Sequence, residues 1–160
     1  MEKDLEEVTK VAKEVITHCG SHPSTLFVTG EKGKVFTNFP DFGPDHEDKV
    51  RQMANMGVKI ACQRNIGDLN YLIFVTEAWM SWLAKGKSYV QPSKDPKHIE
   101  VLTLSTLDVP THKQTMLAYQ MERDKSGNLI ELEKLPLPDG VAVESPLLPA
   151  FIAGYNLIAR

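Results

Sequence analysis

The strongest hydrophobic pattern of the chain lies between residues 70 and 108. An apolar run over 71–80 leads through a basic loop with prolines into a second run over 98–107. Apolar side chains occupy both alternating sides of the first run: Leu72, Ile73, Phe74 and Val75. Since successive side chains of a strand point to opposite faces, this pattern predicts a central strand covered on both faces.

Apolar residues at steps of three and four positions predict two helices. The first helix is expected over residues 3–19, where Gly20 ends it. The second is expected from Asp45, which resembles a helix N-cap, to about residue 65. Its apolar stripe is rich in small residues, among them Gly57, and therefore permits close packing against another element.

Short apolar runs separated by turn residues predict further strands. They are expected at 25–29, 34–37, 114–121 and 129–133. The segments 30–33 and 124–128 have the composition of hairpin turns. Residues 135–149 contain several prolines and are expected to wrap the core, whereas 150–158 favours a short helix.

The order of these elements predicts the fold class. Hairpin turns join several strands, and no repeated strand–helix–strand unit occurs, so the sheet should be largely antiparallel. We expect an α+β protein with a mostly antiparallel sheet of five to six strands, an N-terminal helix, a central helix and a short C-terminal helix. With 160 residues and 42% hydrophobic content, the chain is expected to form a single globular domain over residues 1–160.

Charge and composition narrow the classes of function. The formal net charge of −3 argues against a dedicated nucleic-acid binder with an entirely basic surface. The acidic N-terminus and the lack of a membrane-length apolar run predict a cytoplasmic protein without a membrane partner. The two cysteines, Cys19 and Cys62, are expected to be free and mostly buried, and no cofactor is expected.

The best enzymatic candidates flank the long loop between the two central strands: Glu77, Asp95, His98 and Glu100. Burial at the end of an apolar strand suits a carboxyl group to general acid or base work. These residues would serve a small hydrolase, with or without a metal ion. A simpler alternative is that Glu77 accepts hydrogen bonds from backbone amides at the strand end and that 94–97 is a solvated turn.

Three possible metal ligands also cluster within five positions: His18, Cys19 and His22. Structural zinc sites usually take four ligands from two spaced pairs, and the chain has no second pair of this kind. The cluster is more typical of a helix end, where a histidine interacts favourably with the helix dipole.

The basic loop over 83–98 is a candidate ligand-binding surface. It and its flanks combine aromatic and lysine side chains: Trp79, Trp82, Lys85, Lys87 and Tyr89. Such a mixture can contact phosphates and stack on bases. The absence of arginine between residues 77 and 100 makes nucleic-acid binding the weaker alternative.

The segments 75–80 (VTEAWM) and 92–100 (PSKDPKHIE) resemble small uncharacterised proteins encoded in bacterial genomes and mobile elements. The resemblance covers mainly residues 25–108, and it implies no activity and no functional residue. From the residues themselves we expect a non-catalytic binding or self-assembling module that forms a homo-oligomer, because apolar residues exceed the need of one small core.

Overall fold

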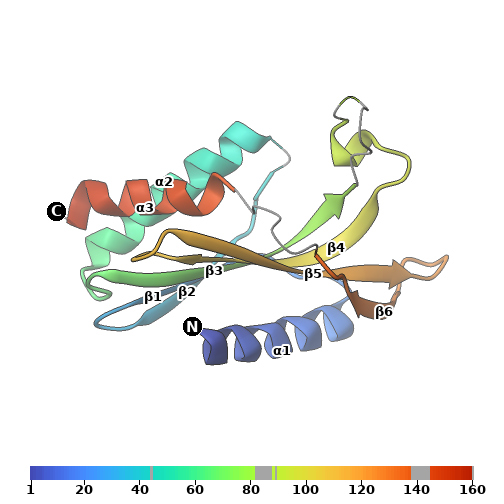
Figure 1. Cartoon of the computed structure of the whole chain (residues 1–160), viewed down its shortest axis with the longest axis horizontal. Coiled ribbons are helices and arrows are strands. Elements are labelled where there is room, and N and C mark those ends of the chain that lie inside the picture. Colours follow the sequence, from blue (N-terminus) through green and yellow to red (C-terminus); the bar gives the residue numbers. More distant parts are fainter. Residues whose placement is uncertain (44, 82–87, 89, 138–144, 160) are drawn as a thin grey trace.

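One six-stranded antiparallel sheet with helices on both faces forms the protein (Figure 1). The computed structural model describes residues 1–43, 45–81, 88, 90–137 and 145–159. Along the chain the elements are α1 (Glu2–Cys19), β1 (Ser24–Gly30), β2 (Lys34–Phe39), α2 (His46–Gln63), β3 (Leu69–Met80), the 3-10 turn η1 (Pro92–Lys94), β4 (Ile99–Asp108), β5 (Lys113–Arg123), β6 (Leu129–Lys134) and α3 (Leu147–Ala159). The predicted α+β class is confirmed.

The sheet has the strand order β2-β1-β3-β4-β5-β6, with every neighbouring pair antiparallel. Helices α2 and α3 cover one face, and α1 covers the other (Figure 1). β3 is a central strand whose side chains alternate between the two layers. Leu72 and Phe74 join the cluster under α2 and α3, whereas Ile73 and Val75 join the cluster over α1. The prediction of a strand covered on both faces is therefore confirmed.

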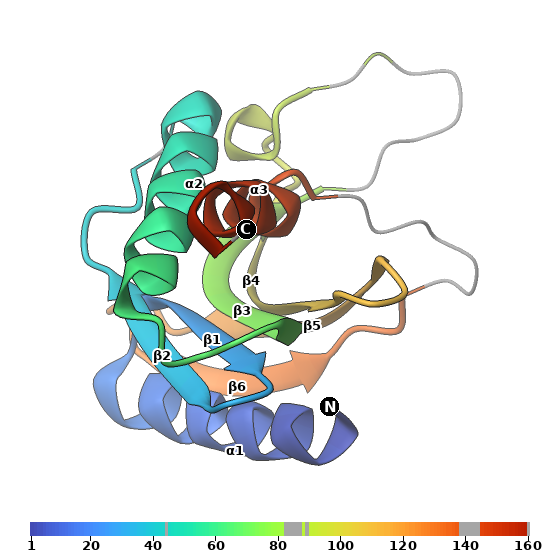
Figure 2. The same cartoon turned by 90° about the vertical axis from the view of Figure 1, so that its left-hand side faces the viewer.

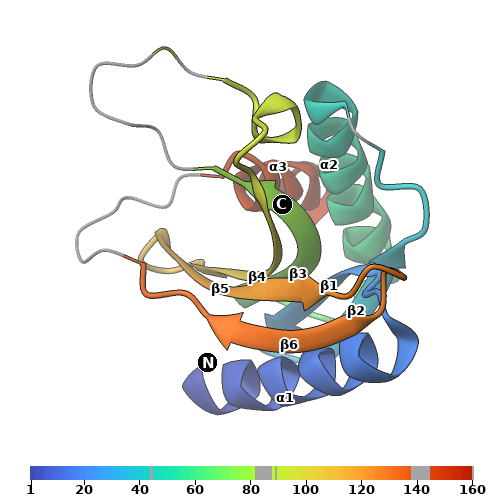
Figure 3. The same ribbon diagram turned by 90° about the vertical axis from the view of Figure 1, so that its right-hand side faces the viewer.

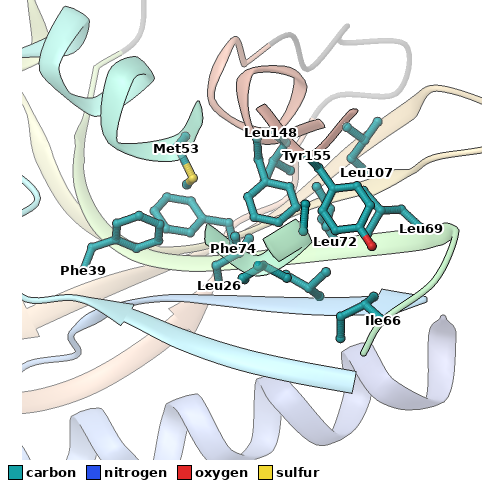
Figure 4. Packing of buried hydrophobic residues seen from close by; sticks show 14 residues of the cluster. Leu26, Phe39, Met53, Ile66, Leu69, Leu72, Phe74, Leu107, Leu148 and Tyr155 are labelled. Atoms are coloured by element: carbon teal, nitrogen blue, oxygen red, sulfur yellow. The ribbon is translucent and has the colours of Figure 1, made fainter. Parts of the chain in front are cut away.

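The larger apolar cluster lies between the sheet and the α2–α3 layer (Figure 4). Two of its aromatic members, Phe39 and Phe74, pack edge to face with ring centroids 6.1 Å apart. Tyr155 of α3 reaches through this layer, and its hydroxyl donates a hydrogen bond of 2.6 Å to the carbonyl oxygen of Gly67. That bond ties the C-terminal helix to the turn that precedes β3.

Helices α2 and α3 approach each other backbone to backbone. A Cβ atom added at Gly57 would lie 2.1 Å from the carbonyl oxygen of Phe151, and one at Gly154 would lie 2.0 Å from that of Ala54. Only glycine fits at such distances. The small-residue stripe predicted for the central helix thus serves a helix–helix contact.

Two expectations need correction. Both cysteines are exposed, not buried. Cys19 is the last residue of α1, one turn beyond the buried Ile16, and Cys62 points about 100° around α2 from the buried Ala61. The C-terminal helix begins at Leu147, within the segment expected to be irregular, because a proline such as Pro149 is tolerated in the first turn of a helix.

Candidate functional site

The register of the central strands brings two of the predicted acidic residues together. β3 and β4 pair Trp79 with Glu100 and Glu77 with Leu102. Glu77 and Glu100 are therefore diagonal neighbours on the same face of the sheet, the face that α1 covers. The sequence alone left this proximity undecided.

Arg123 of β5 joins these carboxylates, and sequence reasoning missed it. Its Nε donates to Oε2 of Glu100 at 2.9 Å, and its Nη2 donates to Oε1 at 3.0 Å. Its Nη1 donates to the carbonyl oxygen of Gly20 at 2.7 Å. The hydrogen bonds to Glu100, and the nearby charges of Glu100 and Glu77, raise the pKa of the Arg123 guanidinium above its ordinary value.

Glu77 also has a donor within the protein. Its Oε1 accepts a hydrogen bond of 2.5 Å from the backbone N–H of His22. Together with the Arg123 bond to Gly20, this contact holds the connection between α1 and β1 against the sheet. Both carboxylates form contacts that connect β3, β4 and β5 with the segment between α1 and β1. Their role as catalytic groups of a hydrolase stays a prediction.

The other two predicted acid–base residues serve the turn before β4. Asp95 accepts a hydrogen bond of 2.9 Å from the backbone N–H of Lys97. The ring of His98 packs edge-on against Trp79, with centroids 4.3 Å apart, and Trp79 remains 49% exposed. Within the described residues, neither Asp95 nor His98 forms a hydrogen bond to Glu77 or Glu100.

A cavity of about 490 Å³ lies beside the same end of the sheet. Its lining combines residues of opposite charge, Lys49 with Glu77 and Glu100, and two aromatic residues, Phe42 and the predicted ligand-binding residue Trp79. Because the lining favours neither anions nor cations, its chemistry selects no particular class of ligand.

Two of the three candidate metal ligands, His18 and His22, use Nδ1 in hydrogen bonds to the backbone. Nδ1 of His18 donates to the carbonyl oxygen of Glu14 at 2.8 Å, and Nδ1 of His22 donates to that of Pro23 at 2.7 Å. In the part of the chain that the structure describes, no group of three or more His, Cys, Asp or Glu side chains is placed to hold a metal ion.

The basic-loop candidates fall mostly outside the described residues: Trp82, Lys85, Lys87 and Tyr89. Nucleic-acid binding through this loop therefore stays a prediction.

A second candidate surface lies at the edge strand β2, which sits between α1 below and α2 above in Figure 2. β2 pairs with β1 on one side, and the sheet ends there. Three of its residues, Lys34, Phe36 and Asn38, are exposed, and Phe36 is 69% exposed. A large, solvent-exposed aromatic side chain on an edge strand is typical of an interaction surface.

The other edge strand, β6, has a different character (Figure 3). It carries three charged residues in six positions: Glu131, Glu133 and Lys134. Charges on an edge strand oppose pairing with further strands. β2 carries one charge, Lys34, which pairs with Asp4 of α1. Of the two edge strands that the structure describes, β2 is therefore the less charged and the more favourable for pairing with a further strand.

An apolar groove of about 240 Å³ runs between β2 and the N-terminal half of α1. Val8, Val11, Phe27 and Phe36 are among its apolar lining residues. The rings of Phe27 and Phe36 are 6.1 Å apart, and Val11 is 47% exposed. The groove extends the apolar surface of the edge strand onto the helix.

The main-chain groups of β2 alternate in direction. The N–H of Gly30 donates to the carbonyl oxygen of Gly33 at 3.0 Å, which marks a hydrogen-bonded pair at the hairpin end. Bonded and non-bonded pairs alternate along an antiparallel ladder, so the adjacent Lys34 belongs to a non-bonded pair. By the same alternation, the N–H and C=O groups of Lys34, Phe36 and Asn38 point away from β1.

Comparisons with protein-family models, with curated proteins and with solved structures give no match to this chain. Among the described residues, no helix has the length and apolar character needed to cross a membrane. The fold and the surfaces above therefore carry the functional argument.

Proposed function

We propose that the protein is a non-catalytic binding module that takes up an extended polypeptide segment as an additional strand on β2. The observation that carries the proposal is Phe36, which is 69% exposed on an edge strand beside an apolar groove. Strand addition combines affinity from main-chain hydrogen bonds with specificity from alternate side chains.

The free groups of β2 define the chemistry of the partner segment. Three residues, Lys34, Phe36 and Asn38, direct N–H and C=O groups outward, so three alternate residues of the partner pair with them. Side chains of these three residues point to the face that α1 covers, where the apolar groove lies. A partner segment with an apolar side chain facing Phe36 and no charge at its centre fits this edge.

The proposal also places the protein in the cytoplasm. Cys19 and Cys62 are both free and exposed. Accessible thiols persist in reducing compartments and are oxidised in secreted proteins. Fractionation of the source cells tests this assignment, and recovery of the protein outside the cytoplasm would contradict it.

An NMR titration tests strand addition. The probe is a synthetic peptide with the sequence of residues 33–40 (GKVFTNFP), added to ¹⁵N-labelled protein at up to about 1 mM, where weak binding is detectable. We expect the largest amide shifts at Lys34, Phe36 and Asn38, because their N–H groups become hydrogen-bonded.

The matched control is the same peptide with an N-methyl group on the phenylalanine that corresponds to Phe36, which removes the central N–H donor. Equal binding of both peptides, or shifts confined to the region of Glu77 and Trp79, would refute strand addition at β2. In samples that are monomeric by sedimentation, no shift at the highest peptide concentration would refute it as well.

A further inference from the structure

We infer that the segment added to β2 is β2 of a second copy of the chain, in an antiparallel register centred on Phe36. This inference rests on the proposed strand addition and names its partner. It would make the protein a twofold-symmetric dimer with one continuous twelve-stranded sheet, two copies of the six-stranded sheet.

The outward backbone groups of β2 are self-complementary. Residues with outward groups occur at positions 34, 36 and 38, which are symmetric about Phe36. When two copies run antiparallel with Phe36 opposite Phe36, Lys34 of each copy lies opposite Asn38 of the other. All outward N–H and C=O groups of both strands then find partners. A shift by two residues in either direction leaves some of them unpaired.

The side chains agree with this register. The single charge of β2, Lys34, meets the uncharged Asn38 of the second copy, so no like charges face each other. The two Phe36 rings become a cross-strand aromatic pair at the symmetry axis, which removes their apolar surface from water. The groove beside each ring continues this apolar surface on both sides of the axis.

Helix α3 offers a rival surface for self-association. It has no charged residue, and its Leu157 is 77% exposed. Nothing in the structure shows which partner would cover that face, whereas the β2 edge specifies its partner through hydrogen-bonding positions. Association through α3 is therefore an outcome that the experiment must separate.

Sedimentation velocity of the full chain, from about 1 µM to about 1 mM, tests the dimer. The decisive variant is Phe36→Pro. Proline lacks the outward N–H but breaks no bond to β1, so the edge strand tolerates it. We expect a concentration-dependent dimer for the wild type and a dissociation constant raised about 100-fold or more for Phe36→Pro.

Lys134→Pro on β6 is the matched control. The N–H of Leu135 donates to the carbonyl oxygen of Ala118 at 2.9 Å, so the adjacent Lys134 directs its N–H away from β5. This variant places a proline at an equivalent position of the opposite edge, and we expect the wild-type dissociation constant. Unchanged circular dichroism, and a cooperative melting transition at a protein concentration at which the wild type is monomeric, establish that both proline variants are folded.

The register is tested by charge at Asn38. Its side-chain oxygen accepts a hydrogen bond of 2.8 Å from Thr25 Oγ1, and glutamate keeps an acceptor there. In Asn38→Glu the new carboxylate lies opposite Lys34 of the second copy and should lower the dissociation constant of the dimer about fivefold. Asn38→Lys places two positive charges opposite each other and should raise this constant about fivefold. The same direction of change in both variants would refute this register.

The outcomes separate the two proposals. A wild-type chain that stays monomeric up to about 1 mM while the peptide still binds β2 would overturn the dimer and leave strand addition intact. An oligomer that is insensitive to Phe36→Pro but is lost in Leu157→Glu would assign self-association to α3 and overturn the inference.

Discussion

The contacts of Arg123 lead to the sharpest prediction about stability. Replacing it by methionine keeps most of the apolar stem but removes the bidentate pair with Glu100 and the bond to Gly20. The two side chains of the ion pair are 21% and 22% exposed, so the pair is neither a surface pair nor fully buried.

The magnitude follows from these exposures. Fully exposed pairs contribute about 0–1 kcal/mol, and removing one partner of a buried pair costs about 3–5 kcal/mol. For Arg123→Met we expect a loss of about 2 kcal/mol in the free energy of unfolding, an intermediate value. For a domain of this size, that loss lowers the melting temperature by about 4–8 °C.

Urea unfolding monitored by circular dichroism measures the loss, and a double-mutant cycle assigns its cause. Glu100→Gln keeps an acceptor oxygen and should cost about 1 kcal/mol. If the ion pair is the cause, the double variant Arg123→Met with Glu100→Gln should cost less than the sum of the two single variants. If the free energy of unfolding of Arg123→Met lies within about 0.5 kcal/mol of the wild-type value, the contacts of Arg123 do not stabilise the fold as expected.

Two further predictions concern the contacts of α2 and α1. Gly57→Ala should lower the free energy of unfolding in urea by about 3 kcal/mol, because its Cβ would overlap the backbone of Phe151. Gly43→Ala is the control and should be neutral, since an added Cβ there has no atom within 4 Å. Equal effects of the two substitutions would contradict the close contact between α2 and α3. Hydrogen bonds from Lys34 and Tyr71 lower the pKa of Asp4 below its ordinary value of 3.8. The stability difference between wild type and Asp4→Asn should therefore be constant above about pH 5 and decrease as the pH falls below 3.8 through the lowered pKa. A difference that does not decrease below pH 3.8 would exclude this contact as its source.

Local patterns predicted the elements well because their causes are local. The three- and four-residue spacing of apolar residues over 3–19 corresponds to α1, and the turn composition over 30–33 corresponds to the β1–β2 hairpin. Asp45 is the N-cap of α2, and its side chain accepts a hydrogen bond of 3.1 Å from the N–H of Glu47. Capping, turn geometry and amphipathic spacing involve residues only a few positions apart.

Exposure at element ends was harder to predict. Cys19 continues the apolar stripe of α1, yet it is exposed because the helix extends one turn past its last buried contact. Pro149 suggested irregular structure, but its position in the first turn of α3 allows a helix. In both cases the local sequence is compatible with two structures. Contacts with neighbouring elements determine which of the two forms.

The hydrophobic pattern of the chain was sufficient to predict the α+β class, the two-sided burial of the central strand, and the presence of acidic residues where that strand ends. The pairing of the strands in space brings Glu77 and Glu100 to the same face and allows Arg123, 23 residues beyond Glu100, to reach that face. It also decided which strand forms an open edge with Phe36 exposed. The physical reason is that periodicity specifies which side of a strand is apolar, whereas register and strand order depend on pairings between distant segments.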